Sequence, residues 1–208
     1  DQILGDVRDG RTRILVGTQM MAKGHDFPGV TLVGVINADQ GLFGTDFRAG
    51  ERLAQTLVQV AGRAGRADRP GEVLVQTSYP EHPLLQRLLG GGYEAFATAA
   101  LEERRLAGWP PYSHLALLRA EAERPGLALE FLQQLRQALG RPADVTVLGP
   151  APAPMEKRGG RWRAQLLLQA VRRPALHAAL DQCAGVAGGL PLARKVRWFT
   201  EVDPQDLF

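Results

Sequence analysis

The sequence predicts an α/β protein in two parts: a first part with a mostly parallel sheet, and a small α+β domain with a ferredoxin-like β-α-β-β-α-β plan. In the first part, short apolar runs typical of strands alternate with helical segments, which favours parallel strands joined by helices. In the second part, strand and helix patterns follow one another in the β-α-β-β-α-β order. The sequence Gly-Trp-Pro-Pro at residues 108–111 separates the two parts, because proline interrupts regular structure.

The elements of the first part follow from apolar runs bounded by Gly, Pro and Asp. Strands are predicted at residues 14–18, 32–36 and 72–77, and helices at residues 49–65, 82–89 and 93–106. In the second part, strands are predicted at residues 114–120, 145–148, 163–169 and 195–202, and helices at residues 127–139 and 175–183. We place the domain boundary after Gly108, which gives domains of residues 1–108 and 109–208.

Composition excludes several classes of protein. The chain has 208 residues, of which 45% are hydrophobic, and a net charge of +3. It contains no run of the roughly 18 apolar residues needed to cross a membrane and no signal-peptide pattern, so we expect a cytoplasmic protein without a membrane partner. The single Cys183 excludes an internal disulfide and predicts a buried thiol on a helix. The chain begins with Asp1 and not with Met, and we expect further motifs upstream.

Positive charge is concentrated in the second part. Residues 1–108 contain 12 basic and 13 acidic side chains, a balance of −1, whereas residues 109–208 contain 13 and 9, a balance of +4. One cluster has only Glu156 as a nearby acid, and its members are Lys157, Arg158, Arg161, Arg163, Arg172 and Arg173. Such a cluster favours a polyanion such as nucleic acid, with a solvated charged surface as the alternative.

The helix predicted at residues 49–65 carries the most informative chemistry. At about 100° per residue, one face collects the polar side chains of Arg52, Gln59, Arg63 and Arg66, while leucines and a valine occupy another face. Gly62 and Gly65 among them each cost about 1 kcal/mol of helix propensity, which an amphipathic helix with a basic face would not explain. Guanidinium groups suit the charge that develops on a transferring phosphoryl group.

Three strings of residues resemble superfamily 2 helicases, and more closely their PriA family of replication-restart helicases. Residues 59–66 read QVAGRAGR and resemble motif VI, and residues 17–30 read GTQMMAKGHDFPGV and resemble motif V. Residues 46–66 read DFRAGERLAQTLVQVAGRAGR and resemble the PriA family in particular. Two later strings, VLGPAPAPMEKRGGRWRAQLLLQ and KVRWFTEVDP, resemble its C-terminal domain. The resemblance implies that the first part belongs to a RecA-like helicase lobe.

The resemblance also implies roles for individual residues in the first part. Arg63 and Arg66 resemble the motif VI arginines that reach ATP across an interlobe cleft, and Arg66 is the expected arginine finger. The expected nucleotide-binding residues are Gly24, Asp26, Gln59, Arg63 and Arg66. Thr18 and Lys23 are the expected contacts to the DNA backbone, with a loop cap and a solvated lysine as the respective alternatives. Asp46 is expected to be a helix N-cap.

Most of the ATP site is expected elsewhere. The sequence has no G-x-x-x-x-G-K-[ST] loop and no acidic magnesium motif, so ATP and Mg²⁺ should be bound mainly by another lobe, and this chain alone should be inactive. Zinc belongs to the family, but the family's zinc-binding cysteines are not in this sequence, which therefore predicts no metal site. Asn37 stands where the family pattern leads us to expect an aspartate. An alternative function is therefore a non-catalytic DNA-binding scaffold with an inactive ATPase lobe.

The loop at residues 157–163 is the strongest local feature of the second part. Lys157, Arg158, Arg161 and Arg163 supply charge around two glycines, and Trp162 offers a face for base stacking, so all five are predicted to bind DNA. A charged hairpin with its tryptophan in the core is the alternative. The resemblance implies branched or single-stranded DNA, other primosome proteins and the replicative helicase loader as partners. It also implies that Arg172 and Arg173 bind the acidic C-terminal tail of single-stranded DNA-binding protein.

Overall fold

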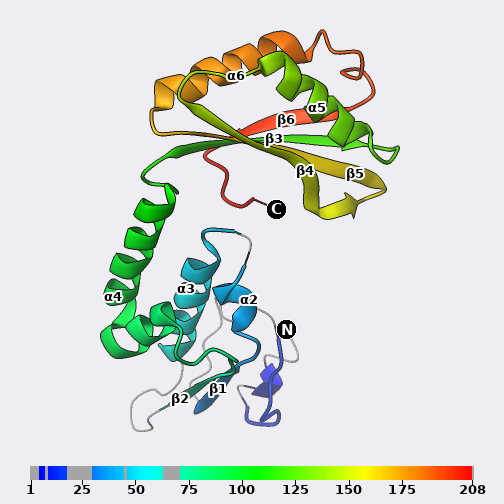
Figure 1. Cartoon of the computed structure of the whole chain (residues 1–208). Helices are drawn as coiled ribbons and strands as arrows, with labels where there is room; N and C mark the ends of the chain where they lie inside the picture. Colours follow the sequence, from blue (N-terminus) through cyan, green and yellow to red (C-terminus); the bar gives the residue numbers. More distant parts are fainter. Residues whose placement is uncertain (1–4, 8, 18–29, 45, 63–70, 208) are drawn as a thin grey trace. The chain divides into compact units, whose positions relative to one another are not determined.

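The computed structural model describes residues 5–7, 9–17, 30–44, 46–62 and 71–207. The chain divides into two compact units, Asp1–Glu102 and Glu103–Phe208 (Figure 1). The boundary predicted after Gly108 lies a few residues further along the chain than this division. Among the described helices, none has both the length and the apolar character that crossing a bilayer requires.

The first unit is built around two parallel strands, β1 (Leu32–Val35) and β2 (Glu72–Val75). They pair in register from Leu32 opposite Glu72 to Val35 opposite Val75. Parallel neighbours need a long crossover, and α3 (Ala49–Ala61) lies in that connection. One stripe of α3, including Leu53 and Leu57, is buried in a cluster that also contains Leu85 and Phe96. β1 and β2 confirm the strands predicted at residues 32–36 and 72–77, and α3 confirms the described part of the helix predicted at residues 49–65.

No strand forms over the described residues of the strand predicted at residues 14–18, which are residues 14–17. Ile14 and Val16 are 82% and 87% exposed, so these apolar side chains lie mostly in solvent. The prediction is wrong for these four residues, since an apolar run becomes a strand only where a neighbouring strand accepts its backbone hydrogen bonds.

A short helix that the sequence pattern did not predict, α2 (Asp39–Leu42), follows β1 directly and packs against α3. Gly41 permits this approach, because a Cβ atom at Gly41 would lie 2.7 Å from the Cβ of Leu53. The longer helix α4 (Pro83–Ala107) is interrupted at Gly92, where φ is 69° and ψ is −168°. Only glycine adopts such angles readily, and the interruption agrees with the two separate helices predicted there.

The second unit is a four-stranded antiparallel sheet in the order β4-β5-β3-β6. Its elements follow one another as β3 (His114–Ala122), α5 (Leu127–Leu139), β4 (Val145–Arg158), β5 (Arg161–Ala170), α6 (Arg173–Ala187) and β6 (Arg197–Val202). This is the predicted β-α-β-β-α-β series. Both helices lie on the same face of the sheet (Figure 1).

The core of the second unit lies between that face and the two helices. Along β5, Ala164, Leu166 and Leu168 are buried at alternate positions, as period-2 side-chain alternation requires. From α5, Phe131 is fully buried, and its ring centroid lies 6.1 Å from that of Trp198 in β6. The first strand of this unit, β3, is a central strand of the sheet and is buried along most of its length on both faces.

Cys183 lies in this core, on the buried stripe of α6, as predicted. It is 2% exposed, and burial raises the pKa of its thiol to about 11. Because the thiolate is the reactive species, we expect Cys183 in the folded chain to react with Ellman's reagent at pH 8 at least tenfold more slowly than in the chain unfolded in guanidinium chloride. Equal labelling rates in the two states would contradict the buried position.

Candidate nucleic-acid interface

The β4–β5 hairpin presents the basic loop predicted from the sequence. Gly159 and Gly160 form its two-residue turn, with φ of 55° and 79°. A turn with positive φ at both central residues matches the twist of the flanking strands, and glycine adopts it without strain. The turn places Arg158 directly opposite Arg161, and Lys157 opposite Trp162.

The register divides the hairpin into two faces, because residues directly opposite one another share a face. Trp162 pairs with Ala122, whose side chain is in the core under the helices, so Trp162 and Lys157 lie on the helical face. Arg158 and Arg161 lie on the other face. Two like charges directly opposite each other destabilise a hairpin, and an anion bound between them would remove that cost.

Trp162 is half-buried, and the Nζ atom of Lys157 lies 5.2 Å from its ring centroid. This distance is within the range of a cation–π interaction. Lys157 therefore lies over a surface of the ring, and a base could stack on that surface only if the lysine moved aside.

Two of the cations have carboxylate partners from β3 and the residues that follow it. Arg163 Nε lies 3.6 Å from Glu121 Oε1, and both side chains are largely buried, at 11% and 20% exposure. Arg161 Nη2 lies 3.5 Å from Glu123 Oε1, with both groups more exposed. The expectation that Glu156 is the only nearby acid is wrong, because the sheet brings in glutamates about 40 residues away in sequence.

The two other cations of the hairpin, Lys157 and Arg158, have no carboxylate partner among the described residues. Both side chains are exposed. The ion pair with Glu121 thus holds Arg163 in place, whereas Lys157 and Arg158 are free to contact a ligand from solvent. Arg161 is intermediate, because it has a carboxylate partner but stays exposed.

Arg172 and Arg173 lie at the start of α6, at the opposite end of β5 from the hairpin turn. Arg172 donates a hydrogen bond to Asp144 at 2.6 Å, and Arg173 donates one to Asp203 at 3.3 Å. All four side chains are more than 45% exposed. The ten residues of β5 at about 3.3 Å each place the two arginines roughly 30 Å from the hairpin turn, so the two predicted sites are separate.

Most of the predicted motor residues lie outside the described residues: Thr18, Lys23, Gly24, Asp26, Arg63 and Arg66. Gln59 is described, and it is exposed on α3, away from the buried stripe of Leu53, Leu57 and Val60. The described part of α3 ends at Ala61, and Gly62 is its C-cap residue.

The start of α3 corrects two details of the prediction. The N-cap residue is Arg48 and not Asp46. Asp46 is buried, and its Oδ1 accepts a hydrogen bond from the backbone N–H of Arg48 at 2.9 Å. Its Oδ2 accepts one from Arg52 Nη2 at 2.7 Å. Arg52, predicted to lie in a row with Gln59, is therefore engaged by a buried carboxylate of its own unit.

Asn37 and Asp39 lie at the carboxyl ends of the parallel strands. Asn37 has φ of 55°, and its backbone N–H donates to the side-chain oxygen of Gln76 at 3.3 Å. Asp39 accepts hydrogen bonds from the Thr77 hydroxyl and the Ser78 N–H, and the bond from Thr77 is the main cause that lowers the pKa of Asp39. In this structure Asp39 connects the end of β1 to the end of β2.

Two protein families match the sequence of this chain. Residues 1–68, which include β1 and α3, match the family described as the helicase conserved C-terminal domain. Residues 105–205, which include the basic hairpin, match the primosomal protein N C-terminal domain, also called the PriA C-terminal domain. The chain is thus similar to a helicase C-terminal domain in its first part and to a primosomal C-terminal domain in its second part.

The relatives are replication restart proteins named PriA. The chain is 49% identical to that of Haemophilus influenzae over 98% of this chain and 28% of the relative. It is 38% identical to that of Bacillus subtilis over 88% and 23%, and 42% identical to that of Synechocystis over 80% and 20%. The chain belongs to the PriA family. It spans about a quarter of the length of the curated relatives it matches.

Proposed function

We propose that the chain is part of an ATP-dependent 3′ to 5′ DNA helicase of the PriA type, which recognises stalled or branched replication forks and starts primosome assembly. The observation that carries the proposal is 49% identity to a replication restart protein over 98% of the chain. The basic hairpin adds a physical reason, since exposed cations around a glycine turn favour phosphate groups. A cytoplasmic location follows from such a role.

In this proposal, the first unit completes an ATP site that residues outside this sequence mostly form. Arg63 and Arg66 stabilise charge on the γ-phosphoryl group of a Mg²⁺-bound ATP, and Gly24, Asp26 and Gln59 contribute to the nucleotide side of the cleft. Thr18 and Lys23 contact the DNA backbone. Support for Gln59 comes from α3, whose buried stripe leaves this residue exposed one turn before the predicted arginines.

The second unit would bind DNA through the hairpin. Lys157, Arg158 and Arg161 contact phosphates, Trp162 stacks on a base when Lys157 moves aside, and Arg163 orients the strand through Glu121. We also assign this unit to the ferredoxin-like plan. Its first strand, β3, lies between its third and fourth strands, which is the order that a split β-α-β unit produces.

Arg172 and Arg173 would bind acidic residues of the C-terminal tail of single-stranded DNA-binding protein. Both arginines already hold exposed aspartates, and a tail carboxylate can replace Asp144 or Asp203 as a charge-assisted partner. Arg172 also borders a surface depression of about 380 Å³ with Pro142 and Pro174 in its lining, which offers an apolar surface beside the charge. Other primosome proteins and the replicative helicase loader are the further proposed partners.

Two measurements test this function. The purified chain should bind forked DNA with a dissociation constant that rises steeply with salt, because phosphate contacts release counterions. It should show no magnesium-dependent ATP hydrolysis with or without that DNA, because the phosphate-binding loop is not in this sequence. Absence of DNA binding would contradict the hairpin assignment, and robust hydrolysis would contradict the division of the ATP site.

The alternative proposal is a non-catalytic scaffold, which the asparagine at position 37 favours. In the structure Asn37 has positive φ, a conformation that asparagine tolerates better than most residues, so a local backbone reason also accounts for it. An ATPase assay of the full-length parent protein with forked DNA separates the two proposals. Hydrolysis stimulated by DNA would exclude the scaffold.

A further inference from the structure

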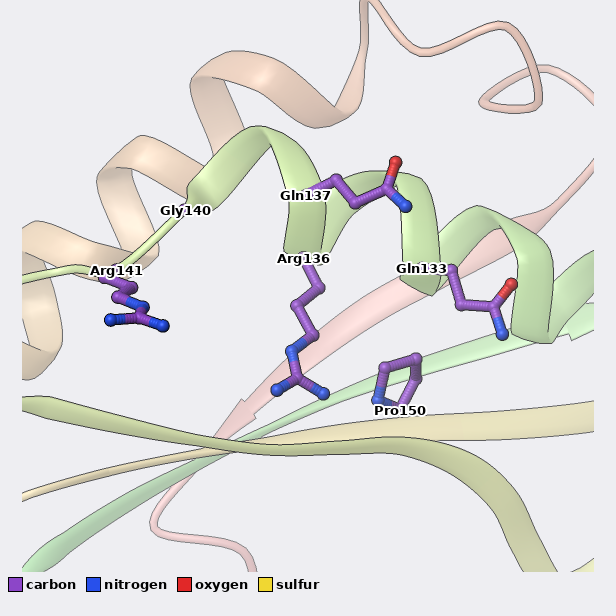
Figure 2. A pocket seen from close by; sticks show the side chains of 6 residues that line it. All are labelled: Gln133, Arg136, Gln137, Gly140, Arg141 and Pro150. Atoms are coloured by element: carbon purple, nitrogen blue, oxygen red, sulfur yellow. The ribbon is translucent and has the colours of Figure 1, made fainter.

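A polar stripe on α5 lines a surface depression that the DNA-binding hairpin does not include. Gln133, Arg136, Gln137 and Gly140 are spaced three, four and seven residues from the first, so they lie along one side of the helix. Together with Arg141 and Pro150, they line a depression of about 570 Å³. Figure 2 shows the side chains of Arg136 and Arg141 extending toward β4, with Pro150 beside the guanidinium of Arg136.

The lining carries only neutral and positive groups. It contains two guanidinium groups and two side-chain amides, and no carboxylate. Within the described residues, neither Arg136 nor Arg141 forms an ion pair, whereas Arg119, Arg163 and Arg172 of the same unit each have a carboxylate partner. Arg136 donates a hydrogen bond to the backbone carbonyl of Gly149, which orients its guanidinium beside β4.

Helix electrostatics alone do not account for both arginines. Arg136 is in the last turn of α5, where a cation interacts favourably with the negative end of the helix dipole. Arg141 lies beyond the helix end, after the C-cap residue Gly140. The helix end contributes about −0.5 charge, whereas the two guanidinium groups contribute two full positive charges, so the depression as a whole attracts anions.

The shape of the depression indicates which anion it would accept. Gln133, Arg136, Gln137, Gly140 and Arg141 are all exposed, so the site is an open surface and not an enclosed pocket for a small molecule. Guanidinium forks and amide N–H groups match the oxygens of a phosphate. An open site with these donors suits one phosphodiester of a longer polymer.

The strand β4 connects this depression to the hairpin. Pro150 and Lys157 are both on β4, which is an edge strand of the sheet, and Lys157 lies on the helical face, as α5 does. The register of β4 shifts between Pro152, opposite Ala164, and Lys157, opposite Trp162, so the seven residues from Pro150 to Lys157 advance only about four positions along β5. At about 3.3 Å per position this is roughly 13 Å, a distance that about four base pairs cover at about 3.4 Å per pair. We infer that the α5–β4 depression binds a phosphate of the same duplex backbone that the hairpin contacts. This inference rests on the DNA binding proposed above.

The test uses a double variant of the full chain that combines Arg136→Gln with Arg141→Gln. A charge-matched control combines Arg194→Gln with Lys195→Gln. Both control residues are exposed and lie before β6. Fluorescence anisotropy with a labelled stem-loop DNA measures affinity. We expect the first variant to bind about tenfold more weakly at about 0.1 M salt, with a salt slope reduced by about one to two, while the control changes little.

The length of the DNA distinguishes one continuous backbone from two independent sites. With a stem of about twelve base pairs the full tenfold loss should appear, and with a single-stranded dinucleotide it should disappear, because one phosphodiester cannot reach from Lys157 to Arg136. The inference fails if the loss is equal for both DNAs, if the control loses as much affinity, or if the variant changes only thermal stability. It also fails if inorganic phosphate or a nucleoside monophosphate binds through these arginines while DNA affinity is unaffected. If the unmodified chain binds no DNA, the proposed function fails first.

Discussion

Replacing Lys157, Arg158 and Arg161 with alanine is expected to weaken binding of the chain to forked DNA by roughly a hundredfold or more at about 0.1 M salt. Each phosphate contact contributes about 0.9 to the slope of log affinity against log salt, so three lost contacts remove nearly three powers of ten at this concentration. The slope itself should become shallower by up to about three. Anisotropy titrations at several salt concentrations measure both quantities.

The same substitutions should not harm the fold. The turn depends on Gly159 and Gly160, and removal of the opposed pair of Arg158 and Arg161 should leave the melting temperature unchanged or slightly higher. A control that removes three exposed cations elsewhere, at Arg87, Arg194 and Lys195, should keep most of the affinity. An unchanged affinity and salt slope in the hairpin variant would show that the loop is only a charged surface.

The second large effect concerns stability. Changing Arg52 to methionine should lower the free energy of unfolding by about 2–3 kcal/mol, because it removes the cation from a buried carboxylate, while the 40% exposure of Arg52 lets solvent screen part of the interaction. The side chain of Asp46 is fully buried, and Arg52 Nη2 lies 2.7 Å from its Oδ2. Methionine retains most of the apolar length of arginine, so the loss reports the charge and not the volume. Urea denaturation followed by circular dichroism measures it.

A double-mutant cycle separates this role from a catalytic one. If the pair is coupled, adding Asp46→Asn to Arg52→Met should recover part of the lost stability, because no buried charge then lacks its partner. Arg87→Met, on an exposed position of α4, is the matched control and should change stability by less than about 0.5 kcal/mol. If Arg52→Met is as stable as the parent chain, Arg52 does not stabilise Asp46 and could instead belong to the polar row with Gln59.

Patterns of short range predicted the elements well. The alternation along residues 163–169 predicted β5, and the spacing of Leu53, Leu57 and Val60 predicted the buried stripe of α3. The strand predicted at residues 14–18 had the same kind of apolar run, but its described residues have no neighbouring strand. Apolar composition is a local property, whereas membership of a sheet depends on a partner.

The charges of the candidate site were harder to predict. The sequence places Glu156 beside the basic loop, whereas the sheet places Glu121 and Glu123 there. An ion pair of a buried arginine was missed altogether: Arg119 on β3 is 6% exposed, and its Nε lies 2.9 Å from Oε2 of the more exposed Glu201 on β6. A charged residue within an otherwise apolar strand pattern was the one signal of this pair.

By itself, the sequence determined the order of the elements in the second unit, the two glycines of the basic loop and the family to which the chain belongs, because these depend on residues close together along the chain. Only the tertiary structure decided which cations have carboxylate partners and which remain exposed for phosphate. The physical reason is that an ion pair requires its charged atoms within about 4 Å of one another in space, whatever their separation in the sequence. The register of β3 against β5 and β6, and not spacing in the sequence, brings Arg163 to Glu121 and Arg119 to Glu201 while Lys157 and Arg158 stay in solvent.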